Sequence, residues 1–203
     1  MEKQEHWETV YQTKDHTKVG WYQPSCDSSL ELIEKIGVSK NASVIDIGAG
    51  ASTFVDGLLD RGFKNITLLD LSNEALTITR ERLADKAHIP NYLVEDITTV
   101  SLPQHYDLWH DRAAFHFLLD ESEQQRYIHT MLDSLNSEGY AIIGTFAVDG
   151  PESCSALTVK QYNRKRMEDV LDGQMAIIDM VERIHITPSG SEQKFSFFIL
   201  KPI

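Results

Sequence analysis

Two glycines behind an acidic residue form the most informative chemical segment of the chain. Residues 44–52 read VIDIGAGAS, so Gly48 and Gly50 follow a β-branched run that contains Asp46. Glycine lets the backbone turn sharply and approach a ligand closely. A helix is expected at about 53–61, and a helix N-terminus offers free N–H groups. The order of strand, glycine turn and helix therefore predicts a site for a nucleotide-like ligand.

The next strand-like run narrows the ligand, because it ends in Asp70, 20 residues after Gly50. A carboxylate at this place can accept hydrogen bonds from ribose hydroxyls. The dinucleotide fingerprint GxGxxG fails at Thr53, and the phosphate loop GxxxxGK[ST] is absent. The loop holds no basic residue to meet phosphates and lies beside Asp46. The expected ligand is a cationic nucleoside without phosphates, and S-adenosylmethionine has these properties.

A second group of reactive side chains follows Trp109 at the end of the fourth strand-like run. His110 is the leading candidate for a general base or a substrate contact, with a hydrogen-bonded structural histidine as the alternative. Asp111 and Arg112 are candidates for catalysis, or for an ion pair that shapes the loop. His116, between two phenylalanines, is a candidate substrate or lid contact and otherwise a satisfied, partly buried histidine.

Aromatic residues precede the first core helix, in a segment that the central sheet does not need. Trp7, Tyr11 and Trp21 are candidates for a lid that stacks on the substrate or lies near a sulfonium by cation–π attraction. The alternative is ordinary apolar burial against the edge of the domain. His185, near the end of the sixth strand-like run, is expected on the opposite side.

Alternating strand-like and helical segments must position these residues. Near-continuous apolar character in the early runs is typical of strands buried in a parallel sheet. The expected strands are 43–47, 65–70, 91–94, 106–110, 140–148, 175–187 and 193–201. Because only the turn 188–191 joins the last two, they are expected to pair antiparallel. Ser72 is expected to cap one helix, and Asp120 with Glu123 to form a capping box for another.

The expected fold is therefore α/β: a doubly wound, mostly parallel seven-stranded sheet with helices on both faces and a C-terminal antiparallel hairpin. The 203 residues fit one domain, with a lid and first helix at 1–40 and a Rossmann-like core at 41–203. The formal charge of −12, from 31 acidic and 19 basic residues, argues against nucleic acid. No apolar run suits a membrane span, and two distant cysteines favour a reduced, cytoplasmic protein.

Five motifs in this order resemble those of the class I S-adenosylmethionine-dependent methyltransferases over most of the chain. They are VIDIGAGAS, LLDLS, VEDIT, YDLWHDRAAFHFL and LNSEGYAIIGTF. Ser52 departs from the family, which usually has a third glycine there. The resemblance implies that backbone around Gly48, Ala49 and Gly50 holds the methionine part of the cofactor. It further implies ribose binding by Asp70 and adenine contacts by the following residues: Leu71, Asp96 and Ile97. Asp46 and His110 complete the expected cofactor-binding set.

The function expected from the resemblance is methyl transfer from S-adenosylmethionine to a small molecule. A protein lysine methyltransferase is the alternative, because HWETVYQ and VGWYQ are similar to the openings of some such enzymes. Against it, no Asn/Asp-Pro-Pro-Tyr type of motif follows the fourth strand. A catalytically silent cofactor-binding domain is a third possibility. No metal site is expected, and the acceptor atom and the oligomeric state stay open.

Overall fold

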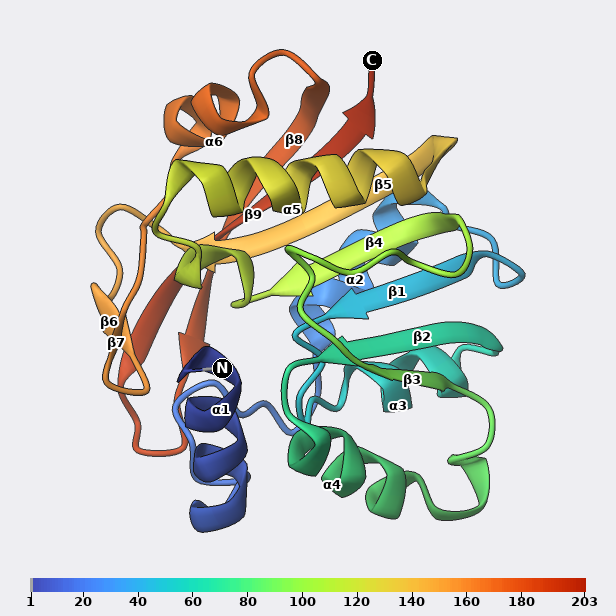
Figure 1. The fold of residues 1–203 in the computed structure, drawn as a ribbon, viewed down its shortest axis with the longest axis vertical. Coiled ribbons are helices and arrows are strands. Elements are labelled where there is room, and N and C mark those ends of the chain that lie inside the picture. The colour runs from blue at the N-terminus through green and yellow to red at the C-terminus, as the bar shows by residue number, and fades with distance from the viewer. Residues whose placement is uncertain (1) are drawn as a thin grey trace.

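A seven-stranded sheet with the order β3-β2-β1-β4-β5-β9-β8 forms the centre of the computed structural model (Figure 1). The structure describes residues 2–203. Strands β1 to β5 pair in parallel along this order, whereas β9 pairs antiparallel with both β5 and β8. The seven strands are β1 (Ser43–Ile47), β2 (Asn65–Asp70), β3 (Asn91–Val94), β4 (Tyr106–Arg112), β5 (Leu135–Phe146), β8 (Met175–Ile186) and β9 (Glu192–Pro202). The predicted fold class is confirmed.

Helices cover both faces of the sheet because successive strand residues point to opposite sides. In β1, Val44 belongs to a core that includes residues of α2, α3 and α4, whereas Ile45 belongs to a core with α5 and α6. The helices are α1 (Glu2–Thr13), α2 (Asp27–Ile36), α3 (Phe54–Asp60), α4 (Asn73–Leu83), α5 (Glu121–Ser134) and α6 (Arg164–Leu171), with 3₁₀ turns η1 (Ala84–Lys86) and η2 (Phe115–Phe117). The sheet is thus doubly wound.

Strands β4 and β5 differ most from the sequence prediction. Strand β4 continues to Arg112, so the reactive side chains after Trp109 are strand residues with alternating directions. Strand β5 covers Leu135–Phe146 rather than the expected 140–148, so it begins five residues earlier. Its pairing with β4 shifts register between Tyr106 and Leu108, which accommodates the extra length.

One of the two predicted helix caps is present. The Ser72 hydroxyl accepts a hydrogen bond from the Ala75 amide at 3.1 Å, as predicted. The prediction of a capping box was wrong, because the Asp120 side chain makes no cap hydrogen bond. The Glu123 amide donates to the backbone carbonyl of Asp120 instead. The Glu123 carboxylate instead binds the Lys3 ammonium of α1 at 2.7 Å. A tertiary ion pair has replaced the local cap.

The segment before α2 folds over the edge of the sheet where the parallel strands end. Helix α1 lies beside this edge, as does the two-stranded sheet of β6 (Ser153–Cys154) and β7 (Leu157–Thr158) (Figure 1). Helix α1 packs against α4, where the Glu8 carboxylate accepts from the Ser72 hydroxyl at 2.6 Å and from the Glu74 amide at 3.3 Å. These bonds fix α1 to the start of α4.

Replacing Glu8 should therefore loosen α1 without unfolding the sheet. In Glu8→Ala we expect faster amide exchange across residues 2–13 and at the start of α4, because each lost bond contributes about 1 kcal/mol. Hydrogen exchange followed by mass spectrometry measures this. Glu5→Ala removes an exposed carboxylate from the same helix and should leave exchange unchanged. Equal exchange in both variants would contradict the proposed anchor.

Candidate active site

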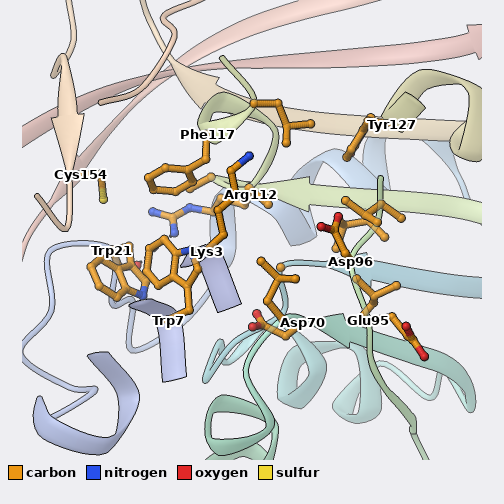
Figure 2. Close-up of a pocket in the computed structure, with 18 of the residues that line it drawn as sticks. Lys3, Trp7, Trp21, Asp70, Glu95, Asp96, Arg112, Phe117, Tyr127 and Cys154 are labelled. Carbon is orange, nitrogen blue, oxygen red and sulfur yellow. Dashed lines mark hydrogen bonds between the residues drawn. The ribbon is translucent and has the colours of Figure 1, made fainter. Parts of the chain in front are cut away.

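A cavity with about 910 Å³ of empty space, partly open to solvent, lies at the carboxyl ends of β1, β2 and β4. The chain winds in opposite directions from β1 and β4, so this is the switch point where α/β sheets bind ligands. Figure 2 shows two different ends. One end is acidic, with Asp70, Glu95 and Asp96, and the other groups the aromatic rings of Trp7, Trp21 and Phe117 around Arg112 and Cys154.

The glycine loop passes so close to its neighbours that side chains are excluded. Gly48 and Gly50 have φ values of +62° and +51°, in the left-handed region that favours glycine. A Cβ on Gly48 would lie 2.6 Å from the Cβ of Ala114, and one on Gly50 would lie 2.4 Å from the Tyr11 hydroxyl. The amide of Ala49 donates to the carbonyl of Leu69 at 3.0 Å, which joins the loop to β2.

Arg82 supports the loop from behind, and the sequence reasoning missed it. Its guanidinium donates to the carbonyls of Ala51 and Ser52 at 2.9 and 2.6 Å and pairs with Asp56 at 2.9 Å. No local spacing announces this contact, because α4 and the loop are about 30 residues apart. Ser52, the departure from the family pattern, has a use here, since its hydroxyl accepts from the Phe54 amide at 3.1 Å.

Asp70 is held in place by two backbone amides. Gly50 donates to one carboxylate oxygen and Ser72 to the other, both at 2.8 Å. The pKa of Asp70 is raised to about 6, chiefly by burial and also by the charges of Asp46 and Glu8, while the two amide hydrogen bonds act in the opposite direction. Each oxygen keeps lone pairs for a further donor. Asp70, the predicted ribose contact, thus lines the cavity and can still accept hydrogen bonds.

The expected adenine contacts lie at the same acidic end. Leu71, Asp96 and Ile97 all line the cavity. One carboxylate oxygen of Asp96 accepts from the amide and hydroxyl of Thr98 at 2.8 and 2.7 Å. The other oxygen makes no hydrogen bond among residues 2–203, so it can accept from an amino group.

The three predicted lid residues meet one another above the cavity. The Trp21 indole donates to the Tyr11 hydroxyl at 3.3 Å, and the Trp7 ring packs edge-on against Trp21 and Phe117 at centroid distances of 5.7 and 5.1 Å. Burial, followed by the charge of Asp70, raises the pKa of Tyr11. Its phenol is therefore neutral and can donate a hydrogen bond.

His110 lies beneath the glycine loop and makes hydrogen bonds through both ring nitrogens. Nδ1 is 2.6 Å from the Asp46 carboxylate, Nε2 is 2.8 Å from the Ser29 hydroxyl, and the ring stacks on Phe54 at 3.8 Å. All three polar side chains are buried. His110 lines only a second, smaller cavity, together with Asp46 and Gly48. With both nitrogens engaged, this geometry favours the structural alternative over a general base.

The expected ion pair between Asp111 and Arg112 does not form, because neighbouring strand residues point to opposite faces. The Asp111 carboxylate accepts from the Ala114 and Phe115 amides at 3.0 and 3.1 Å and from the Tyr127 hydroxyl at 2.8 Å. Burial raises the pKa of Asp111 to about 6. Asp111 thus shapes the turn into η2, whereas Arg112 lines both cavities.

His116 lies in the interior of the protein, whereas His185 lies at the edge of the site. His116 is fully buried and lines neither cavity; burial lowers its pKa to about 3, so it is neutral. His185 was expected on the opposite side, and this was wrong. Strand β8 runs parallel to β5 because both are antiparallel to β9, so His185 reaches the site edge and donates to the Gly20 carbonyl at 2.9 Å.

Among residues 2–203, no group of three His, Cys, Asp or Glu side chains is arranged to hold a metal ion. The same part of the chain contains no helix with the length and apolar character that a membrane crossing requires.

Residues 44–139 match a family described as a methyltransferase domain. The chain is 29% identical to malonyl-[acyl-carrier protein] O-methyltransferase 1 of Ilyobacter polytropus, over 48% of this chain and 36% of that protein. It is 27% identical to EEF1A lysine methyltransferase 2 of Danio rerio, over 68% of this chain and 66% of that protein. The chain thus spans about a third to two thirds of these relatives.

Two solved structures share the fold over nearly the whole chain. One, from work on conversion of a disulfide into a thioacetal in echinomycin biosynthesis, has a TM-score of 0.78 at 16% identity and covers 98% of this chain and 92% of that one. The other, an S-adenosylmethionine-dependent methyltransferase from Anabaena variabilis, has a TM-score of 0.77 at 14% identity, covering 99% and 93%. At these identities the likeness concerns the fold.

Removing His110 should cost stability, because Asp46 would keep a buried charge without its partner. In His110→Ala we expect the free energy of unfolding to fall by about 3–5 kcal/mol, and in Ser29→Ala by only about 1 kcal/mol. Urea denaturation measures both. A stable His110→Ala variant that binds S-adenosylhomocysteine yet has lost turnover would instead assign His110 the role of a base.

Binding of S-adenosylhomocysteine should depend on the ionisation of Asp70. Ribose hydroxyls donate to a carboxylate, so binding favours the charged form, which is lost as pH falls through about 6. We expect the affinity to drop about tenfold from pH 7.5 to pH 5. Calorimetry across this range measures it. Asp70→Asn should bind more weakly and without this pH dependence; a dependence that persists in the variant would assign it to another group.

Proposed function

Because residues 44–139 form a class I S-adenosylmethionine-dependent methyltransferase domain, we propose that this chain transfers a methyl group from S-adenosylmethionine to a small-molecule acceptor. The family, the enzyme type and the cofactor predicted from the sequence are confirmed at the level of this domain. The observation that carries the proposal for the acceptor is the shape of the cavity. Its nucleoside-binding end continues directly into an aromatic end beneath α1.

The residues present fit the cofactor. Gly48 lines the cavity and has no side chain, so its backbone can approach the methionine part closely. Asp70 keeps lone pairs for the ribose hydroxyls, and Asp96 keeps one free carboxylate oxygen for the adenine amino group. The acidic end of the cavity also suits a ligand with net positive charge. Bound here, the cofactor supplies an electrophilic methyl group on a sulfonium.

The chain's own contribution is to orient the acceptor and to exclude water. Trp7, Trp21 and Phe117 form apolar walls at the acceptor end. Among the described residues that line this end of the cavity, none is a ready proton acceptor. Burial raises the pKa of the Cys154 thiol to about 11, and the Tyr127 hydroxyl is committed to Asp111. This favours an acceptor that reaches the site already ionised or that needs no base. The rate enhancement would then come from positioning the acceptor rather than from proton transfer.

A small molecule suits this site better than a protein side chain. The acceptor end is covered by α1 on one side and by the β6/β7 sheet, which contributes Cys154, on the other. A protein lysine methyltransferase is the second candidate, and one observation favours it: the similarity to a lysine methyltransferase covers 68% of this chain.

We place the protein in the cytoplasm because both cysteines are free and reduced.

Transfer of labelled methyl groups into a cell extract tests the acceptor class. We expect wild-type protein with labelled S-adenosylmethionine to label the small-molecule pool, whereas label in the protein pool would select the lysine alternative. Asp70→Ala, which should weaken cofactor binding by roughly 1–3 kcal/mol, is the low-activity comparison. Asp60→Ala, which removes an exposed carboxylate on α3, is its matched control.

Calorimetry with S-adenosylhomocysteine completes this test. Binding without any label transfer would support the silent cofactor-binding domain. Failure to bind at millimolar concentration would overturn all three possibilities.

A further inference from the structure

Arg112 is a cation without an anionic partner at the aromatic end of the cavity. Its Nη1 donates to the Trp21 carbonyl at 3.0 Å, whereas Nη2 is buried and has no hydrogen-bond partner in the part of the chain that the structure describes. Arginine keeps its charge in proteins. An N–H group buried without a partner is unfavourable, so Nη2 has unused capacity to bind an acceptor atom.

The surroundings of Arg112 do not neutralise its charge. Its guanidinium lies 4.7 Å from the centre of the Phe195 ring, and no carboxylate of residues 2–203 lies within ion-pair distance of it. Burial holds the Cys154 thiol and the His116 ring in their neutral forms. Three further titratable side chains lie near the guanidinium: Cys26, Asp46 and His185. Burial lowers the pKa of His185.

The other cation of the cavity is already paired. Lys3 binds both carboxylate oxygens of Glu123, at 2.7 and 2.8 Å. Figure 2 shows the Arg112 guanidinium close to Trp21, Phe117 and Cys154, across the cavity from Asp70 and Asp96. The aromatic end therefore combines apolar walls with one positive charge that forms no ion pair among residues 2–203.

We propose that the methyl acceptor carries a carboxylate, bound by Arg112, on an apolar body that packs against Trp7 and Phe117. This inference rests on the proposed function and names the substrate class for the same cavity. The planar guanidinium fork matches a carboxylate in geometry as well as in charge. A cationic acceptor such as a lysine side chain would meet a like charge that forms no ion pair among residues 2–203.

The methionine part of the cofactor has a carboxylate of its own. The test must therefore distinguish binding of Arg112 to the cofactor carboxylate from binding to the acceptor carboxylate. Arg112 also lines the second cavity, beside Gly48 and Asp46, where the methionine part would lie. S-Adenosylhomocysteine has this carboxylate, whereas 5′-methylthioadenosine lacks it. Comparing the two ligands isolates any role of Arg112 toward the cofactor.

The experiment uses phenylacetate and phenylacetamide, which share a body and differ in charge. Each is titrated into the 203-residue protein saturated with S-adenosylhomocysteine, and the fluorescence of Trp7 and Trp21 reports binding. We expect phenylacetate to bind wild type at least about tenfold more tightly than the amide. In Arg112→Gln this preference should disappear, while the affinity for S-adenosylhomocysteine should stay within about threefold of wild type. Arg112→Lys, which keeps the charge, should retain part of the preference.

Arg183→Gln is the matched control, because it removes a guanidinium that is 41% exposed on β8 and outside both cavities. It should keep the full preference for phenylacetate. A wild type that does not prefer the carboxylate, or an Arg112→Gln variant that still does, overturns the inference. It is also overturned if Arg112→Gln weakens S-adenosylhomocysteine tenfold but leaves 5′-methylthioadenosine unchanged. In each case the proposed function stands as long as wild type binds S-adenosylhomocysteine and transfers label.

Discussion

The hydrogen bond from the Gly50 amide to the Asp70 carboxylate is the contact on which the site depends. It joins the loop after β1 to the end of β2, and the same carboxylate accepts from Ser72 at the start of α4. Helix α4 returns the support, since the Thr79 hydroxyl donates to the Gly50 carbonyl at 2.8 Å and Arg82 holds the next carbonyls. Loop, strand end and helix thus form one unit. A side chain at position 50 would break it, because Tyr11 already fills the space.

Alternation along β4 explains why adjacent polar residues have different roles. His110 faces α2 and α3, where Ser29 and Phe54 contact it, whereas Asp111 faces α5 and accepts from Tyr127. Arg112 returns to the first face but lies beyond the helices, at the edge covered by the N-terminal segment. Burial depth therefore decides function along this strand. The inner residues secure the backbone beside the cavity, and only the last one reaches the cavity from that face.

Sequence reasoning reached the parts that local patterns encode. The strand, glycine turn and helix order located one end of the cavity, because left-handed backbone at Gly48 and Gly50 requires glycine and Asp70 follows 20 residues after Gly50. It missed Arg82 and Ser29, whose contacts join segments far apart in the chain. It misjudged Glu123 for the same reason, since the carboxylate pairs with Lys3 rather than capping its own helix.

The two ends of the cavity come from different parts of the chain, so comparison with relatives is informative about only one of them. The acidic end, with Asp70 and Asp96, and the neighbouring Gly48 lie wholly within the segment 44–139 that matches the methyltransferase domain. Much of the acceptor end comes from outside that segment, in α1, the loop before α2 and the β6/β7 sheet. Similarity to relatives with different acceptors is expected where the cofactor binds. Acceptor choice must instead be read from residues such as Trp7, and from how they surround the unpaired charge of Arg112.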